Sequence, residues 1–307
     1  MARTVLDAIG NTPVVQLRRV VPAGAADVFV KLEYYNPTGS YKDRMALAMI
    51  EEAEKRGTLR PGMTVIEYTG GSTGSSIAMV CAVKGYTFRP LSSDAFAREK
   101  LQTMRAFGAD LTILTSEGGK ITLDLFNRFK AEIARRAAEP NTFYTDQMNN
   151  EDSIVGYQPI GEEILRQVGP EIAAFCGAVG TAGMLSGVSA AFRAAGCGAR
   201  LVALEPASSP VLTKGQPGSH RVEGIGVGFW PPHLREGGYD EIRAIDEGEA
   251  RVMARRLAKE EGILAGTSSA LNVAAAVALA QELGSGKTVV TVACDTGLKY
   301  LGGDLFE

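Results

Sequence analysis

The sequence predicts an α/β protein of two domains, each with a mostly parallel sheet between layers of helices. Short apolar runs rich in β-branched residues alternate with helical patterns along almost the whole chain, which is typical of such sheets. The length of 307 residues corresponds to about two domains. A polar stretch at 141–152 and a Pro-Gly turn at 36–42 interrupt the alternation. We therefore expect residues 1–44 and 151–307 to form a larger domain, with residues 45–150 inserted as a smaller one.

Each expected strand is a short apolar run that a glycine, a proline or a polar turn ends, and each expected helix has a longer alanine- or leucine-rich pattern. The expected strands are 28–32, 64–67, 88–91, 111–114, 173–176, 200–204, 242–245 and 288–293. The expected helices are 45–53, 75–84, 96–107, 121–138, 153–168, 184–194, 248–261 and 269–283. Because ligands of open α/β sheets bind beyond the carboxyl ends of the strands, the glycine-rich turns there are the candidate site.

Composition and charge narrow the class of function. The net charge of −3 and the lack of a basic run give no indication of nucleic-acid or membrane binding. The N-terminus lacks the apolar core of a signal peptide, and no apolar stretch reaches the roughly 20 residues that span a bilayer. With four scattered cysteines and two histidines, a zinc site is not expected, and free thiols fit a reducing compartment. We expect a cytoplasmic protein with a small-molecule ligand and no metal.

Lys42 lies in the turn Asn-Pro-Thr-Gly-Ser-Tyr-Lys-Asp-Arg, between an expected strand and an expected helix. Partial desolvation and a nearby helix N-terminus both disfavour its ammonium form, so the amine becomes available as a nucleophile or Schiff-base former. A solvated surface lysine is the ordinary alternative. Lys42 is therefore a candidate that other features of the chain must support.

Two further turns have the order strand, glycine turn, helix. In the first, glycines and hydroxyls could hold a carboxylate at the helix N-terminus, or the hydroxyls could simply cap the helix. In the second, backbone amides could hold a phosphate, or the glycines could serve tight packing. The first turn consists of Thr69, Gly70, Gly71, Ser72, Thr73 and Gly74. The second runs from Gly177 and includes Gly180, Thr181, Ala182, Gly183 and Met184.

A fourth turn, Cys294-Asp295-Thr296-Gly297, follows the last expected strand. A polar side chain there could meet a ring nitrogen or cap the next helix, and local sequence does not separate the two. Two other glycine-rich stretches do not match nucleotide-binding motifs. The run 284–288 has Gln281 where a Walker A loop needs glycine, and 224–229 lacks the dinucleotide spacing.

Together the four turns resemble those of the cysteine synthase and cystathionine β-synthase family, which are pyridoxal-phosphate enzymes of fold type II. The resemblance covers nearly the whole chain, because several other motifs occur in the same order. These are Ile9-Gly10-Asn11-Thr12-Pro13, Lys31-Leu32-Glu33, 224–229 and 261–269. It implies a large cofactor-binding domain, a smaller mobile substrate domain, an active site between them and a homodimer.

The resemblance also assigns roles. Lys42 would carry pyridoxal 5'-phosphate as an aldimine and later move the Cα proton of the substrate. Gly180, Thr181, Ala182, Gly183 and Met184 would bind the cofactor phosphate, and Ser72 would lie near the ring. Thr296 would meet the pyridine nitrogen, although Asp295 beside it leaves the assignment open. Thr69, Gly70, Gly71, Ser72, Thr73 and Gln147 would bind the substrate carboxylate.

The implied reaction is β-replacement on a β-substituted L-alanine through an aminoacrylate, as in an O-acetylserine sulfhydrylase. A hydroxyl at the ring nitrogen makes the cofactor a weaker electron sink, which suits β-elimination better than transamination. Two alternatives stay open: a serine/threonine dehydratase-type ammonia-lyase, and a catalytically weak paralogue that acts as a binding partner.

The chain departs from the family pattern around the ligands. The usual loop Thr-Ser-Gly-Asn-Thr-Gly has Gly70 in place of the serine and Ser72 in place of the asparagine. The phosphate loop has Ala182 and Met184 where the family has glycine and threonine, and Met148 follows Gln147 in place of phenylalanine. We therefore expect a non-standard donor or nucleophile.

Overall fold

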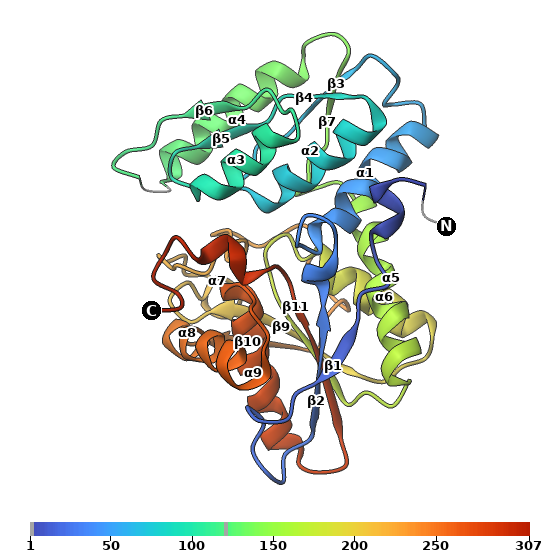
Figure 1. Ribbon diagram of the computed structural model, residues 1–307, viewed down its shortest axis with the longest axis vertical. Coiled ribbons are helices and arrows are strands. Elements are labelled where there is room, and N and C mark those ends of the chain that lie inside the picture. Colours follow the sequence, from blue (N-terminus) through green and yellow to red (C-terminus); the bar gives the residue numbers. More distant parts are fainter. Residues whose placement is uncertain (1–2, 120–121) are drawn as a thin grey trace. The chain divides into compact units, whose positions relative to one another are not determined.

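The computed structural model describes residues 3–119 and 122–307 and divides the chain into two compact units. The first unit comprises Met1–Ile9 and Lys42–Gly156, and the second comprises Gly10–Tyr41 and Tyr157–Glu307. The N-terminal segment thus groups with the first unit, whereas we expected it in the larger domain. The structure confirms the predicted α/β class with mostly parallel sheets (Figure 1).

The second unit is built on a six-stranded sheet with the order β1-β2-β11-β8-β9-β10. Its strands are β1 (Val14–Gln16), β2 (Asp27–Leu32), β8 (Ala174–Ala178), β9 (Arg200–Pro206), β10 (Glu241–Ile245) and β11 (Thr288–Ala293). Only β1 is antiparallel to its neighbour in this sheet. In register, Val290 lies between Phe29 and Phe175. The chain's last strand therefore occupies a central position.

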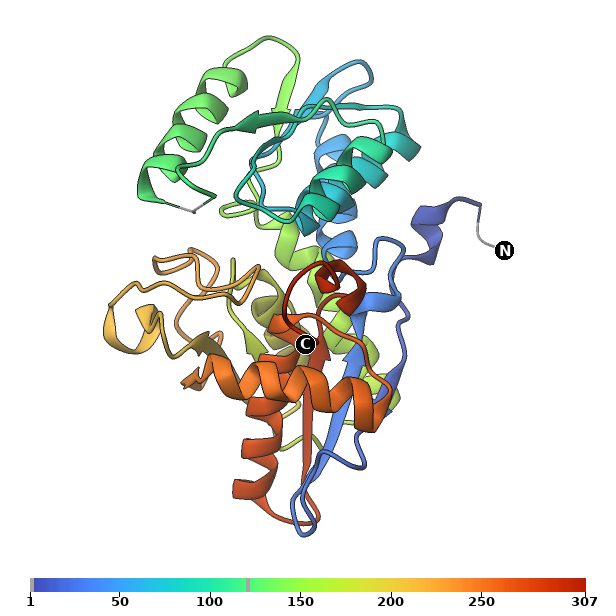
Figure 2. The same cartoon turned by 60° about the vertical axis from the view of Figure 1, so that its left-hand side comes forward.

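Helices cover both faces of this sheet, with α8 and α9 on one side and α5 and α6 on the other (Figure 1). They are α5 (Asp152–Val168), α6 (Gly183–Ala194), α7 (Val211–Lys214), α8 (Glu247–Arg256) and α9 (Thr267–Leu283). Figure 2 shows the orange helices α8 and α9 together against the sheet. The predicted helix 248–261 is α-helical only to Arg256, because a π-helical turn, Leu257–Glu261, completes it before Gly262. Buried alanines and leucines of α9 form much of the core.

The first unit contains two small parallel sheets, β4-β3-β7 and β5-β6, which the bridge between Tyr68 and Leu91 connects. Its strands are β3 (Thr64–Ile66), β4 (Thr87–Phe88), β5 (Leu91–Ser93), β6 (Thr112–Leu114) and β7 (Thr142–Tyr144). Its helices are α1 (Lys42–Lys55), α2 (Ser72–Lys84), α3 (Arg98–Ala106) and α4 (Leu123–Ala137). A core of Ile66, Leu91 and aromatic and aliphatic residues of α4 packs between them.

Further sequence predictions for the elements differ from the structure. The strand expected at 88–91 is two strands, because Pro90 has no N–H and the ladder is interrupted there. Strands β1 and β7, of three residues each, were not predicted. The helix expected from Ser75 begins at Ser72, which brings Ser72 and Thr73 into its first turn. The expected start of α4 at Ile121 lies outside the described residues.

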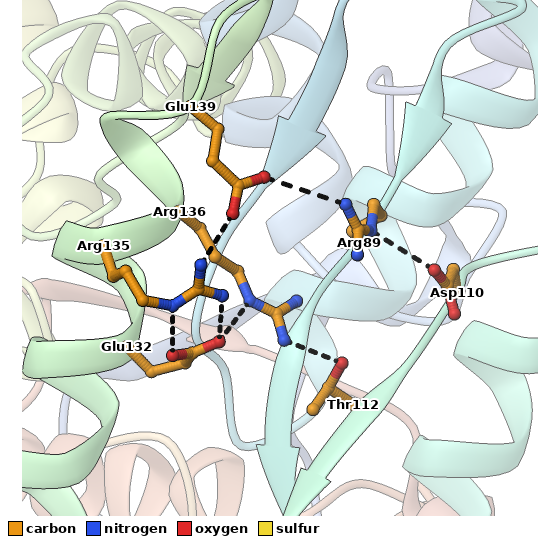
Figure 3. A network of polar contacts seen from close by, with 7 residues as sticks. All are labelled: Arg89, Asp110, Thr112, Glu132, Arg135, Arg136 and Glu139. Atoms are coloured by element: carbon orange, nitrogen blue, oxygen red, sulfur yellow. Dashed lines mark hydrogen bonds and ion pairs between the residues drawn. The ribbon is translucent and has the colours of Figure 1, made fainter.

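A polar network on the first unit links α4 to neighbouring segments (Figure 3). Arg136 donates to Glu132 on its own helix at 2.7 Å and to the Thr112 hydroxyl of β6 at 3.0 Å. Arg135 binds both Glu132 oxygens and also Glu139. Hydrogen bonds from Arg135 and Arg136 lower the pKa of Glu132 to about 2. Arg136, whose guanidinium also binds Glu132, therefore links α4 to β6.

Within the described part of the chain, no helix combines the length and apolar character that a membrane span requires.

Candidate active site

Lys42 is the first residue of α1 and is buried, with 7% of its surface exposed. The three residues before it are bound to the end of β11 in the second unit. Thr296 N–H donates to the Gly39 carbonyl at 3.0 Å, and Tyr41 N–H donates to the Cys294 carbonyl at 3.0 Å. Gly39 has φ +71°, and a Cβ atom there would lie 2.8 Å from Cγ2 of Thr296. The lysine turn is therefore held by backbone bonds that need a glycine.

The end of β11 carries both residues that the sequence left open for the ring nitrogen. The Thr296 hydroxyl accepts a hydrogen bond from Leu298 N–H at 3.3 Å and caps the 3₁₀ turn Gly297–Tyr300. Asp295 is buried, and its Oδ2 accepts the hydroxyl hydrogen of Tyr300 at 2.8 Å. Each side chain thus has a structural partner, and the assignment to Thr296 stays a prediction.

The phosphate-binding turn predicted after β8 has the geometry of an anion cradle. Ala182 has φ +68° and precedes α6, whose N-terminus has no side-chain cap. Gly183 N–H donates to the Thr181 hydroxyl at 3.3 Å. A Cβ atom on Gly180 would collide with the Gly224 carbonyl oxygen. Uncapped amides at a helix N-terminus suit a phosphate group.

Met184 replaces a hydroxyl residue of the family pattern, and its side chain is committed to the interior. It is buried, and its Cε lies 2.6 Å from where a Cβ atom on Gly177 would stand. The glycine in β8 therefore makes room for the methionine. The substitution leaves the backbone of the cradle in place.

Asn272 of α9 is a site residue that sequence reasoning missed. It is fully buried, its Oδ1 accepts from Ala178 N–H at 2.7 Å, and its Nδ2 donates to the Val292 carbonyl at 2.9 Å. It thereby joins the carboxyl ends of β8 and β11, the strands that lead to the cradle and to Thr296. The available signal was one asparagine within the apolar, alanine-rich middle of the helix.

The predicted substrate loop lies in the first unit, between β3 and α2. The Thr69 hydroxyl accepts from the N–H groups of Gly71 at 3.1 Å and Gly74 at 3.2 Å, so the loop closes on itself. Ser92 donates to the Thr69 carbonyl at 2.7 Å. Ser72 is the first residue of α2, and no side chain caps this helix either. The arrangement can present helix N-terminal amides to a carboxylate.

Each glycine of this loop has a side chain packed against it. A Cβ atom on Gly70 would lie 2.8 Å from Cε1 of Phe96. On Gly71, which has φ +147°, it would collide with the stem of Lys100, and on Gly74 with Met104. The loss of the family serine at position 70 is therefore matched by an aromatic ring that occupies the space.

Gln147 and Thr73, both predicted to bind the substrate carboxylate, form a hydrogen bond with each other. The Thr73 hydroxyl donates to Gln147 Oε1 at 2.8 Å, and Gln147 Nε2 donates to the Tyr68 carbonyl at 3.2 Å. Gln147 thus connects the turn after β7 to both ends of the substrate loop.

Glu67, directly after β3, is the second residue that sequence reasoning missed. It is fully buried and accepts hydrogen bonds from Tyr68 N–H at 3.0 Å, Thr145 Oγ1 at 2.6 Å and Gln147 N–H at 3.0 Å. Burial raises the pKa of Glu67 to about 7, against the lowering effect of these hydrogen bonds. The sequence signal was a lone carboxylate at the end of an apolar strand.

Comparison with known proteins identifies the family of this chain. A family model described as "Pyridoxal-phosphate dependent enzyme" matches residues 5–295. The chain belongs to this pyridoxal-phosphate enzyme family. A cysteine synthase of Staphylococcus aureus is 44% identical over 301 residues, which are 97% of this chain and 95% of that protein. A probable cysteine synthase of Bacillus subtilis is 38% identical over 309 residues, 98% of this chain and 96% of that one.

Solved structures with related sequences have a similar fold. The chain matches an O-ureido-L-serine synthase with a TM-score of 0.90 and 35% identity, covering 100% of this chain and 95% of that one. It matches the cysteine synthase of Entamoeba histolytica with a TM-score of 0.92 and 32% identity, covering 100% and 91%. These matches confirm the predicted family, fold type II and the cofactor pyridoxal 5'-phosphate.

The residues present fit that cofactor. Its phosphate needs an anion cradle, its aldehyde needs an amine, and its ring nitrogen needs a polar group. The structure provides the turn Gly180–Met184, the buried Lys42, and Thr296 with Asp295 at the end of β11. Among the described residues, no cluster of histidine, cysteine and acidic side chains could hold a metal ion.

Proposed function

We propose that this chain catalyses β-replacement on a β-substituted L-alanine such as O-acetylserine, with Lys42 as the cofactor-binding and catalytic lysine. The observation that carries the proposal is the buried Lys42, held at the start of α1 by backbone bonds from the preceding turn to β11. Relatives named cysteine synthase and O-ureido-L-serine synthase support the reaction class. In this reaction the bond from Cβ to the leaving group breaks, and a bond from Cβ to a nucleophile forms.

The cofactor, when bound, withdraws electrons from Cα of the substrate. The amine of Lys42 then accepts the Cα proton and later returns it to the same atom, as a general base and acid. The N-terminal amides of α2, with Thr69, Gly70, Gly71, Ser72, Thr73 and Gln147, bind the substrate carboxylate and orient Cα. The cradle of Gly180, Thr181, Ala182, Gly183 and Met184 would hold the cofactor phosphate, and Thr296 would bind the ring nitrogen.

The altered loop supports a donor or nucleophile other than the standard pair. Gly70 brings no hydroxyl to the loop, and the ring of Phe96 lies against it. Ser72 has a shorter side chain than the family asparagine and lacks its amide donors. Both changes concern the loop assigned to the substrate, so we propose that they set which amino acid or nucleophile is used.

Product analysis tests the proposal. Purified protein is incubated with O-acetylserine or serine, with and without sulfide or other small nucleophiles, and amino-acid products and pyruvate are measured. We expect a substituted alanine whose identity follows the added nucleophile. Pyruvate formed at the same rate with every nucleophile would favour the dehydratase reading instead.

The lysine is tested by Lys42→Ala, with Lys55→Ala on the same helix as the matched control. Lys55 is exposed and pairs with Glu52, so its removal leaves the site intact. We expect Lys42→Ala to lose both activity and the visible absorbance of the bound cofactor, whereas Lys55→Ala keeps both. A Lys42→Ala protein that retains turnover would contradict the assignment, and inactive wild-type protein would favour a binding paralogue.

We further propose a cytoplasmic homodimer in which the first unit moves as a substrate domain and the second binds the cofactor. Sedimentation velocity measures the mass in solution, and a monomer at all concentrations would contradict the dimer. Small-angle scattering with and without an amino-acid ligand tests whether the first unit moves when the ligand binds.

A further inference from the structure

Glu67 is a fully buried carboxylate for which the proposed mechanism has no use. Its three hydrogen-bond donors all come from the first unit: its neighbour Tyr68, and Thr145 and Gln147 in the turn after β7. No lysine or arginine of the described residues forms an ion pair with it. A carboxylate left in the interior without a cation, but with three donors, is an arranged polar site and not a packing accident.

The ionisable groups that interact most with Glu67, among the described residues, are acids: an aspartate and two tyrosines. Asp146, in the turn after β7, raises the pKa of Glu67 by its charge, in addition to burial. Tyr144 of β7 and Tyr68 are phenols whose own pKa values are raised by burial and by the charge of Glu67. Strand β4 and helix α4 also pack on β3, and none of their ionisable groups is among the main causes of the shift in the pKa of Glu67. Within the described residues, no positive charge is therefore among the main influences on its ionisation.

The carboxylate is linked to the predicted substrate loop through one residue. Oε2 of Glu67 accepts the backbone N–H of Gln147, and the Gln147 side chain binds the Tyr68 carbonyl and the Thr73 hydroxyl. The hydrogen bond to Glu67 thus fixes the backbone of Gln147 and, with it, the position from which its side chain extends. The side-chain oxygen of Gln147 in turn holds the Thr73 hydroxyl in the first turn of α2.

Protonation would change this arrangement in a defined way. An ionised carboxylate only accepts hydrogen bonds, and three donors satisfy it. The Thr145 hydroxyl has a second acceptor, the Ile66 carbonyl at 3.3 Å. If Oε2 of Glu67 carries a proton, it can donate to Thr145 Oγ1, and the Thr145 hydrogen turns to Ile66. Gln147 N–H then faces a protonated oxygen, which is a poor acceptor, and the turn loses its anchor.

We propose that Glu67 is a positioning residue whose ionised form holds Gln147 and Thr73 in the arrangement that binds the carboxylate of the amino-acid substrate. This inference deepens the proposed function and rests on it. Because the pKa of Glu67 is raised to about 7, the group changes its charge near neutral pH. Carboxylate affinity therefore rises as the pH increases through this value and is weak well below it.

Binding of propionate, a carboxylate without an amine, isolates this effect from titration of the substrate amino group. Calorimetric titration of the holoenzyme is carried out between about pH 5.5 and about pH 8.5, where the propionate itself stays ionised. For the wild type we expect the Kd to fall roughly tenfold across this range, the size expected for one charge-assisted hydrogen bond. Glu67→Gln is expected to bind weakly at every pH, with unchanged visible absorbance.

Thr145→Val provides a second variant that keeps the carboxylate. It removes a hydrogen bond that favours the ionised form, so the midpoint of the pH dependence moves to higher pH. A purely structural role for Glu67 predicts no such movement.

The outcomes separate the two proposals. Wild-type holoenzyme that binds no propionate at any pH would overturn the carboxylate site, and with it the proposed function. Binding that is tight but independent of pH, or pH dependence that persists unchanged in Glu67→Gln, would overturn the role of Glu67 and leave the proposed function standing. If Glu67→Gln does not fold, the wild-type profile and the Thr145→Val midpoint decide the question.

Discussion

The ring of Phe96 lies against the backbone of Gly70, with its Cε1 atom 2.8 Å from where a Cβ atom on Gly70 would stand. A side chain at position 70 and the ring of Phe96 in its present position would occupy the same space. The family serine could not be restored in this loop without moving an aromatic side chain.

Gly70→Ser is therefore expected to destabilise the protein by about 1–3 kcal/mol through overpacking. Urea unfolding measures the loss. Because the Gly70 backbone has no positive φ, the cost is steric, and Phe96→Ala in the same chain should recover much of it. Gly71→Ser is the matched control, since its φ of +147° makes it costly whatever stands at position 96. Strict additivity of Gly70→Ser and Phe96→Ala would contradict the pairing.

Asn272→Ala removes one amide from between β8 and β11. The Ala178 N–H and the Val292 carbonyl lose their buried partner, so we expect a loss of about 3 kcal/mol of unfolding free energy. The cofactor should also dissociate faster, because the strand ends beside the cradle are no longer joined. Thr291→Val is the control: it removes a hydrogen bond between the same strands, to the Cys176 carbonyl, and should lower stability alone. Equal cofactor release from both variants would refute the special role of Asn272.

Glu67 predicts an unusual dependence of stability on pH. Its folded pKa of about 7 lies above the ordinary value of 4.5, so the folded state binds the proton more tightly. The free energy of unfolding should fall as the pH rises from about 4.5 to about 7, by about 3 kcal/mol from this group, and level off above. Urea titrations across this range measure the slope. Glu67→Gln should flatten it, and an unchanged slope in that variant would assign the effect elsewhere.

Glu132 predicts the opposite behaviour on the surface of the first unit. Its pKa is lowered to about 2 by hydrogen bonds from Arg135 and Arg136, so its stabilising effect is present above the ordinary value of 4.5 and is lost as the pH falls toward 2. Glu132→Gln should lower stability by about 1 kcal/mol at neutral pH and by little at strongly acid pH. Glu139→Gln, which removes one partner of Arg135 and a longer ion pair with Arg89 at 4.0 Å, should cost less. A larger loss from Glu139→Gln would show that the network is centred elsewhere.

The sequence was most informative where strands end. The glycine turns were located because glycine and proline act locally on the backbone, and the structure has strand-to-helix turns at residues 67–71 and 179–182. The strand expected at 88–91 was wrong because a single proline interrupts a ladder without ending the apolar pattern. Strands β1 and β7 were missed although β3 and β6, which have the same length, were predicted. Strand β7 lies at the start of the polar stretch 141–152, which was interpreted as an interruption between domains.

The sequence did not predict which residues far apart in the chain would contact each other. Glu67 meets Thr145 and Gln147 only because β3 and β7 pair in parallel, and nothing near residue 67 announces it. The contact of Phe96 with Gly70 and the position of Asn272 between two strands likewise arise only in the folded chain. Local sequence patterns show which residue types lie at the ends of strands. The partner of a buried polar group depends instead on which strands pair in the folded sheet.

Strand β11 is the last strand in the chain, yet it lies between β2 and β8 in the sheet. A ribosome delivers the residues of the first unit as an early, nearly continuous stretch, Lys42–Gly156, whereas the sheet of the second unit lacks its middle until residue 293 has been made. Until then, β2 and β8 of the nascent second unit each lack a partner strand on the side where β11 will pair. A chain that ends before Thr288 would contain the lysine turn and the phosphate cradle in full, but it would lack the strand that joins β2 to β8.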